Sequence, residues 1–374
     1  MIIRPVAMTD LPALQEIAVE SGPGFTSLVD DRDFLAQKVQ RSVESFARSV
    51  KTPGDENYLF VLEDPETGAI MGTTGIEASV GIQRPLYHYR CRQVVHYSPE
   101  LKLLRRLDVL DMCHHYVGCS EICTLFLRPQ FRRAHAGKLL SRVRFLFMAQ
   151  HPQRFAETVI AEMRGVADAN GQSPFWNWLR EHFVDLDFDT VTRMVGTGDN
   201  GFIADLMPRH PLYTHLMNEN ARAVIGQVHH NTRPALNMLE AEGFRHTGYV
   251  DPFDGGPTVE AKLADIRSVS GSTACGIQVV ENVEPDLDQW HAGGQGRILA
   301  ITNNGAADFR ATVTGSARYL PSRNLLQVPA TLAKALKLSN DGRARFMELA
   351  TSSAGRQPTT IPLRQQREVL HAHR

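Results

Sequence analysis

The sequence is poor in cysteine and has no excess of charge of either sign. Its five cysteines, an odd number, are spread through 374 residues. They are therefore not a disulfide framework, and a reducing compartment is expected. Lysine and arginine total 40 against 41 acidic residues, which gives a net charge of −1. Proteins that bind nucleic acid electrostatically usually carry a basic excess, so no nucleic-acid partner is expected.

Long hydrophobic runs are also missing. No stretch of about 18 apolar residues occurs, which argues against a transmembrane helix. The first residues, MIIRPVAMTDLPAL, lack the apolar core of a signal peptide. We therefore expect a cytoplasmic protein with no membrane partner. The hydrophobic share of 43% is ordinary for a globular protein, and the chain length suggests two or three domains.

Motifs of several other enzyme classes are absent. The chain has no Gly-x-Ser-x-Gly nucleophile elbow and no Gly-x-x-x-x-Gly-Lys-Ser/Thr phosphate loop. The cysteines and histidines between Cys113 and Cys123 do not have the spacing of a common zinc site. Neither a metal nor a permanently bound cofactor is expected.

Apolar strand patterns alternate with amphipathic helix patterns, which predicts an α/β fold. Two apolar segments, Glu121–Leu127 and Thr158–Met163, are predicted as buried strands. Composition changes at a Ser- and Gly-rich stretch, which divides the chain. The predicted division is a main region over 1–265, a linker over 266–276, a small β-rich module over 277–350 and a mobile tail over 351–374.

A basic segment separates the strand Glu121–Leu127 from a long helix pattern. It contains Arg132, Arg133 and Lys138, and the small residues Ala136 and Gly137. Backbone amides at a helix N-terminus, together with Arg or Lys side chains, form a site for a pyrophosphate, and small residues let the phosphates approach the backbone. The alternative is an ordinary basic helix start that faces solvent.

The segment Val224–Val228 is predicted as a strand, and His229 follows it directly. Polar residues at strand ends are where α/β proteins form their sites. A histidine can exchange protons near neutral pH, which suits acid–base catalysis. The alternative is a loop histidine hydrogen-bonded to the backbone. Because side chains alternate along a strand, we expect only one of His229 and His230 to face a site.

The order of these elements resembles the GNAT-type N-acyltransferases, although His135 stands where their acyl-CoA loop usually has glycine. A more specific resemblance, to bacterial arginine N-succinyltransferases, covers most of the chain. The segments that carry it are SEICTLFL (120–127), LLSRVRFLFMAQHPQRFAE (139–157), VIAEMRGVAD (159–168), SPFWNWL (173–179), FIADLMPRHPLY (202–213), AVIGQVHHNTRPAL (223–236), LEAEGFR (239–245) and FDGGPTVE (253–260).

The resemblance implies a GNAT-like mixed twisted sheet flanked by helices, with a small C-terminal β-rich module. It implies transfer of succinyl from succinyl-CoA, a co-substrate, to the α-amine of L-arginine by direct amine attack. His229 matches the family's proton donor, and Leu125 matches a succinyl-CoA contact, made through its backbone. Leu127, Arg132, Arg133, Ala136, Gly137 and Lys138 would complete the acyl-CoA site. Because some family members occur as paralogous subunits, a homo- or hetero-oligomer is expected.

Both substrates carry a carboxylate, and arginine also carries a guanidinium. Arg164 is a candidate for a carboxylate, and Glu162, Asp251 and Asp254 are candidates for the guanidinium. Each could instead be a surface charge or a turn residue. Two other functions stay open: acylation of another amine, such as ornithine succinylation or plain acetylation, and a weakly active subunit that needs a catalytic paralogue.

Overall fold

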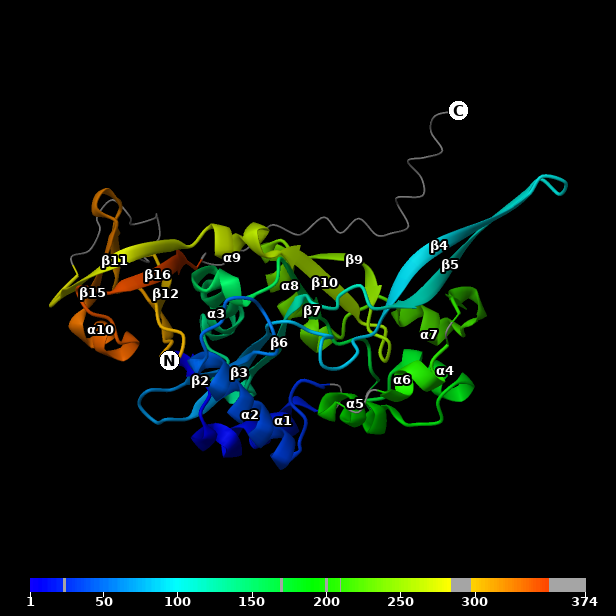
Figure 1. Ribbon diagram of the computed structural model, residues 1–374, viewed down its shortest axis with the longest axis horizontal. Coiled ribbons are helices and arrows are strands. Elements are labelled where there is room, and N and C mark those ends of the chain that lie inside the picture. The colour runs from blue at the N-terminus through cyan, green and yellow to red at the C-terminus, as the bar shows by residue number, and fades with distance from the viewer. Residues whose placement is uncertain (23–24, 169–170, 199–200, 209, 284–296, 350–374) are drawn as a thin grey trace.

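The computed structural model describes residues 1–22, 25–168, 171–198, 201–208, 210–283 and 297–349. A single mixed sheet runs through the molecule (Figure 1). In sheet order its strands are β14 (Arg318–Leu320), β15 (Leu325–Pro329), β11 (Thr273–Val280), β16 (Arg343–Glu348), β12 (Leu299–Asn303), β13 (Ala311–Thr314), β1 (Ile2–Pro5), β2 (Asn57–Glu63), β3 (Ile70–Glu77), β6 (Ser120–Leu127), β7 (Thr158–Glu162), β10 (Pro257–Lys262), β9 (Arg245–Val250), β4 (His88–Ser98), β5 (Leu103–Cys113) and β8 (Leu212–Tyr213).

Helices cover both faces of this sheet. They are α1 (Leu11–Ser21), α2 (Arg32–Ala47), α3 (Ala136–Gln150), α4 (Pro174–His182), α5 (Phe188–Thr197), α6 (Gly201–Leu206), α7 (Glu219–Val224), α8 (Arg233–Glu242), α9 (Arg267–Ser270) and α10 (Ala330–Leu336). Helix α2 begins where Asp31 caps it by accepting a 2.8 Å hydrogen bond from the Phe34 N–H. The predicted α/β fold, a mixed sheet flanked by helices, is confirmed.

Strands β2 and β3 are buried on both faces. The sequence of β2 is accordingly almost continuously apolar, whereas β3 also contains buried glycines and threonines. Side chains of β2 alternate between two cores. Leu59 and Val61 pack with α1 and α2, whereas Phe60 and Leu62 pack with the apolar face of α3. The sheet is thus sandwiched between α1 and α2 on one side and α3 on the other.

The C-terminal strands continue the same sheet. Strand β13 pairs antiparallel with β1, and Ala311 and Phe309 are fully buried in the core that contains α3. The segment 266–276, predicted as a linker, holds helix α9 and the first residues of β11. The division into domains stays a prediction, and the proposed tail, 351–374, lies outside the described residues.

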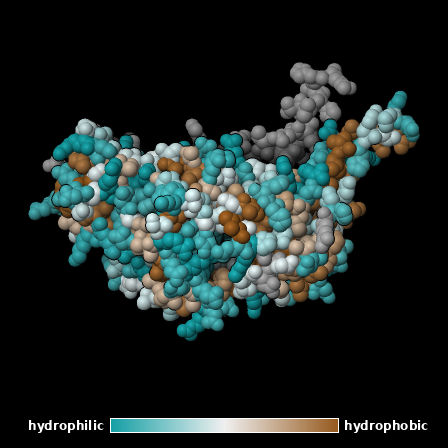
Figure 2. Space-filling view, viewed as in Figure 1, coloured by the Kyte–Doolittle hydropathy of each residue, from teal (hydrophilic) through white to brown (hydrophobic). Residues whose placement is uncertain are grey.

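Strands β4 and β5 form a long hairpin that projects from one end of the molecule (Figure 1). Its outer part exposes large apolar side chains, among them Val95, Tyr97, Leu101 and Leu104. Figure 2 shows hydrophobic surface on this projecting arm. Within the described residues, no helix has the length and apolar character needed to cross a membrane.

The predicted strand at Val224–Val228 is wrong. Helix α7 extends to Val224, and Val228 makes only an isolated antiparallel bridge with Gly165. The backbone turns at Gly226, whose φ of +72° suits glycine. His229 therefore follows a single bridge beside the end of β7, not a regular strand.

Candidate active site

The centre of the molecule opens where two parallel strands separate. Strands β6 and β7 pair only at Ser120 with Val159 and at Glu121 with Ile160. Beyond these pairs a cavity of about 770 Å³ is lined by the rest of β6 and by the end of β7. Its wall also includes the segment between α1 and α2, one face of α3, helices α5 and α8, and the β9–β10 loop. The cavity thus has walls from both faces of the sheet.

Strand β6 bulges beside this cavity. Thr73 of β3 pairs with Phe126, but Gly75 pairs with Cys123, so β6 has one residue more than β3 in this interval. Thr124 takes a φ of +55°, which is strained for a β-branched residue. The bulge releases the backbone around Thr124 and Leu125 from regular pairing. Leu125 and Leu127 both line the cavity.

The basic loop leads from the end of β6 into α3. His135 is the residue before this helix, and its φ of +68° lies in the left-handed region that glycine adopts freely. Histidine is one of the residue types that tolerate this region best. The loop therefore keeps a glycine-like backbone at the position where the sequence departs from the usual pattern.

The predicted acyl-CoA residues divide into two groups. Arg132 and Gly137 line the cavity together with Leu125 and Leu127. Arg133, Ala136 and Lys138 are in the same loop and first helical turn but outside the cavity lining. Arg133 forms a 3.4 Å ion pair with Asp64, and Ala136 is fully buried under the helix start.

Five acidic residues line the cavity; Glu20 is ion-paired with Arg128, and the other four interact with one another. Glu121 comes from β6, Glu162 from β7, and Asp251 and Asp254 from the β9–β10 loop. Burial raises the pKa of Glu121 well above its usual range, and the nearby charge of Glu162 adds to this rise. Burial and the charge of Asp254 likewise raise the pKa of Asp251. This part of the cavity therefore favours a cationic ligand.

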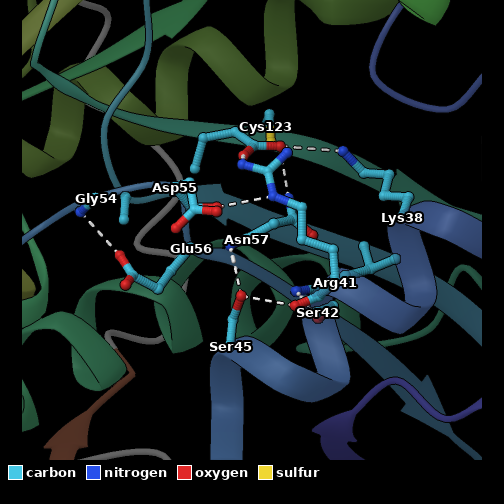
Figure 3. A network of polar contacts seen from close by, with 12 residues as sticks. Lys38, Arg41, Ser42, Ser45, Gly54, Asp55, Glu56, Asn57 and Cys123 are labelled. Atoms are coloured by element: carbon cyan, nitrogen blue, oxygen red, sulfur yellow. Dashed lines mark hydrogen bonds and ion pairs between the residues drawn. The ribbon is translucent and has the colours of Figure 1, made fainter. Parts of the chain in front are cut away.

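A network on the α2 side explains why Glu121 differs from its cross-strand neighbour, Glu77. Glu77 forms a 3.2 Å ion pair with Lys38 and accepts a hydrogen bond from the Asn57 side chain. Figure 3 shows Lys38 of α2 close to Cys123 of β6 within this network. No ion pair joins Glu121 to any residue in the described ranges, and the charge of Lys38, which is paired with Glu77, acts on its carboxyl only from a distance.

The β9–β10 loop is fastened to the end of β7 by Asp254. Its carboxylate accepts hydrogen bonds from the N–H groups of Gly165 (2.6 Å) and Gly256 (2.7 Å). A Cβ at Gly256 would lie 2.1 Å from the carbonyl oxygen of Met163, so only glycine fits there. The two glycines at 255 and 256 therefore allow a close approach that places Asp254 next to Arg164, whose pKa is lowered by burial.

His229 is buried, with 7% of its surface exposed. Its N–H donates a 2.9 Å hydrogen bond to the Arg164 carbonyl, and its Nδ1 accepts one of 3.2 Å from the Asn231 N–H. This acceptor role puts the proton of the neutral ring on Nε2. Burial, then the positive charge of Arg164, then His230 lower the pKa of His229, so the ring is neutral at pH 7.

Strand alternation does not separate His229 from His230, although only one of the two, His230, lines the cavity. Their ring centroids are 4.2 Å apart, because the two residues lie at the start of a 3-10 turn and not on a strand. The three residues predicted to bind the substrate, Glu162, Arg164 and Asp254, all line this cavity.

Three further residues of the site are missing from the sequence-based prediction. Glu121 lies inside an apolar strand pattern, and Arg144 lies inside the apolar helix pattern of α3. Thr124 belongs to a bulge that leaves no sequence signal. For the two charged residues a signal did exist, since a charge within a buried run needs a partner or a ligand.

Comparison with known proteins shows the family of the chain. A family model described as arginine N-succinyltransferase beta subunit matches residues 1–268. Arginine N-succinyltransferases of Citrobacter koseri and Yersinia pseudotuberculosis serotype O:3 are 41% and 40% identical to the chain over 349 residues, which is 93% of this chain and 98% of each relative. The chain belongs to the arginine N-succinyltransferase family. The resemblance seen in the sequence is confirmed, as is the prediction that the chain is an acyltransferase enzyme.

Structural comparison extends the family relationship to the C-terminal strands. The structure of arginine/ornithine succinyltransferase subunit AI from Pseudomonas aeruginosa superposes with a TM-score of 0.83 at 33% identity. The match covers 94% of this chain and 99% of that protein. The β-rich C-terminal part therefore belongs to the architecture of this arginine N-succinyltransferase family member.

Proposed function

We propose that the chain transfers the succinyl group of succinyl-CoA to the α-amine of L-arginine, giving N2-succinylarginine and CoA. The observation that carries this proposal is the two-ended cavity between β6 and β7. One end has the basic loop and the N-terminus of α3, which suit the phosphates of an acyl-CoA. The other end has four carboxyl groups, which suit a cationic amino acid. No permanently bound cofactor enters the reaction.

The bulge in β6 supports a role for the Leu125 backbone between these two ends. An N–H released from strand pairing can donate to the thioester oxygen, on which negative charge develops during amine attack. The attacking nitrogen forms a bond to the carbonyl carbon, and the C–S bond then breaks. The nitrogen loses a proton, and the departing thiolate gains one.

His229 is proposed as the group that moves these protons. Its ring is not part of the cavity lining, but its centroid lies 4.2 Å from that of His230, which does line the cavity. A neutral imidazole can take up a proton from the amine and deliver one to the thiolate. Its buried position beside Arg164 keeps the ring neutral at pH 7, as a base requires. Asn231, which donates to Nδ1, fixes the orientation of the ring.

Direct attack needs no acyl-enzyme. Cys123 is the thiol that lines the cavity, and burial raises its pKa to about 12. The protonated thiol is a poor nucleophile, so this cysteine is not set up to accept an acyl group. The amine of the substrate is therefore the nucleophile of the proposed reaction.

The acceptor would lie with its guanidinium among Glu121, Glu162 and the β9–β10 carboxylates. Glu121 forms no ion pair within the described residues, so a substrate cation would supply one. Arg164 would bind the α-carboxylate of the same substrate, with Asp254 holding it in place.

A second acceptor is ornithine, which the name of the Pseudomonas aeruginosa relative mentions. Ornithine also carries a cationic end but has a shorter side chain, so it would reach the carboxyl groups less completely. The test measures the rates at which the purified chain succinylates arginine and ornithine. A comparison of the two rates distinguishes an enzyme specific for arginine from one that accepts both amines. The oligomeric state and a paralogous subunit stay predictions.

Release of the CoA thiol tests the proposal. The purified chain is incubated with succinyl-CoA, with and without L-arginine. We expect release that depends on arginine and saturates with it. Arginine-independent release would show hydrolysis instead of transfer. If the folded protein releases no CoA alone but does so after a paralogous chain is added, it is a subunit that needs a partner.

A further inference from the structure

Arg144 is a buried cation in the middle of α3. Only 2% of its surface is exposed, yet it is one of the residues that line the cavity. It lies seven positions after Gly137, which also lines the cavity, so the two share one face of the helix. Seven residues rise by ~10 Å along a helix axis, so this face runs from the phosphate end of the cavity to its interior.

Within the described residues, the guanidinium of Arg144 forms no ion pair. Its Nε donates a 3.0 Å hydrogen bond to the Ser141 carbonyl, and its Nη2 donates one of 3.2 Å to the Ser141 hydroxyl. In the described part of the chain, no carboxylate lies within 4 Å of the guanidinium, and Nη1 makes no hydrogen bond. The neighbouring contacts are therefore all with neutral groups.

The acidic residue that acts on Arg144 from a distance is already engaged. Glu242 forms a 3.1 Å ion pair with Arg142 and accepts a 2.7 Å hydrogen bond from the Ser268 N–H. Burial lowers the pKa of Arg144 to about 10, so its side chain keeps its charge at neutral pH. A buried charge without a partner destabilises a fold strongly. Its presence in the wall of a cavity points to an anionic ligand.

We propose that Arg144 binds the distal carboxylate of the donor's acyl group and so selects a dicarboxylic acyl-CoA. This inference rests on the proposed function. Arg144 interacts electrostatically with Cys123, which lies two residues before Leu125 on β6. The guanidinium is thus close enough to β6 to interact with it beside the bulge, and it lies about two helical turns from Gly137. An extended succinyl chain places its carboxylate carbon ~4 Å from the thioester carbon, a length that fits this position.

The planar guanidinium of Arg144 is chemically complementary to a carboxylate. Arginine binds carboxylates through two parallel hydrogen bonds, and a water-poor wall strengthens the pair. A neutral acyl chain of equal length would leave the charge of Arg144 unpaired. The same residue would therefore attract succinyl and disfavour butyryl, whose methyl group replaces the carboxylate.

The test compares two donors in three variants. Succinyl-CoA and butyryl-CoA are each given to the wild type, to Arg144→Gln and to Arg142→Gln, with arginine as acceptor. Arg142 lies on the same helix but is paired with Glu242, so it is the matched control. We expect Arg144→Gln to lower the ratio of kcat/KM for succinyl-CoA over butyryl-CoA by about 100-fold, since it removes a charge-assisted bidentate contact. Arg142→Gln should leave that ratio unchanged.

Binding of free CoA distinguishes recognition of the acyl carboxylate from a structural role and from a phosphate-binding role of Arg144. It carries no acyl group, so we expect its Kd to be the same in the wild type and in Arg144→Gln. An equal loss for both donors, or a weakened Kd for free CoA, would overturn the proposal in favour of a structural or phosphate-binding role. Should Arg144→Gln not fold, Arg144→Lys decides, because it keeps the charge but loses the fork and should lower the ratio partially. Failure of the wild type to use succinyl-CoA at all would instead contradict the proposed function.

Discussion

The hydroxyl of Thr73 donates a 2.9 Å hydrogen bond to the carbonyl oxygen of Thr124, the residue at which β6 bulges. Both residues are buried. The next residue on β3, Thr74, is equally buried, but its hydroxyl has no partner within the described residues. Two adjacent residues of β3 therefore differ in one respect. The Thr73 hydroxyl is hydrogen-bonded to the bulge of β6, whereas the Thr74 hydroxyl is not.

Thr73→Val should loosen the bulge, whereas Thr74→Val should not. Valine keeps the shape of threonine but leaves the Thr124 carbonyl unpaired, which costs ~1–3 kcal/mol of unfolding free energy. We expect a lower Tm and a lower kcat for Thr73→Val, because the adjacent Leu125 backbone shifts. For Thr74→Val we expect an equal or higher Tm and normal kcat. Equal kcat in both variants would count against catalysis at the bulge.

His229→Ala should lower kcat while free CoA still binds. Loss of a general acid–base group typically lowers the rate by ~10²–10⁴-fold. His230→Ala, which removes the neighbouring ring, should have a smaller effect. Steady-state kinetics with calorimetric CoA binding measures both. A near-normal kcat in His229→Ala would assign the proton transfer to another group.

The pH profile of the wild type carries the signature of His229. A base must be neutral, so kcat falls as the pH drops through its pKa. Because burial and Arg164 lower this pKa, the acid limb should lie below pH ~6.5, the usual value for histidine. Arg164→Gln removes the nearby positive charge, so the limb should move to higher pH. A limb that does not move in this variant contradicts the assignment.

The raised pKa of Glu121 predicts how stability depends on pH. The folded chain retains a proton on this carboxyl at pH values where the unfolded chain has lost it. The free energy of unfolding therefore falls as the pH rises from the unfolded pKa, ~4.3, towards the raised folded value. Glu121→Gln removes this loss, so its Tm advantage over the wild type should grow from pH 5 to pH 8.

Glu77→Gln is the control for this measurement. Its carboxylate forms ion pairs with Lys38 and Arg41, so its removal should lower the Tm at pH 8. The two glutamates face each other across β3 and β6, but the substitutions should have opposite signs. A lower Tm for Glu121→Gln at pH 8 would contradict a carboxyl that forms no ion pair. With arginine, Glu121→Gln should also raise KM.

His135→Gly should be tolerated, in contrast to His135→Val. The φ of +68° at this position is free of strain for glycine but disfavoured by ~1–2 kcal/mol for a side chain that cannot adopt it readily. Glycine also loses more entropy on folding, so the net change in unfolding free energy should be near zero. We expect CoA to bind His135→Gly with Kd within about twofold, but His135→Val more weakly. Equal binding by all three proteins would show that the loop backbone is not part of the site.

The sequence predicts the framework of the site better than its chemistry. The strands β6 and β7 and the helix α3 follow from apolar patterns, and the basic loop follows from its charges. The middle of β7 is buried, whereas β6 alternates between buried and half-buried residues. The role of Glu121 could not be predicted from such an apolar pattern. Its position where β6 and β7 separate depends on how the two strands pair. The bulge at Thr124 depends on register with β3, which a single strand does not encode.

The errors near His229 have a local cause. The residues from Val224 to Val228 have the apolar character of a strand, but Gly226 turns the chain so that one bridge forms instead. The alternation of side chains that a strand imposes is therefore lost, and His229 and His230 lie ring to ring. Arg144 is hidden for a different reason, because its lack of an ion pair depends on how Arg142 and Glu242 pair.

The most direct test of the central claim follows the nitrogen that becomes acylated. The purified chain is given succinyl-CoA and L-arginine labelled with ¹⁵N at the α-amine only, and the product is observed by NMR. The account predicts a new amide signal from the α-¹⁵N, formed in step with CoA release. CoA release without that signal, or acylation at an unlabelled nitrogen, would contradict it.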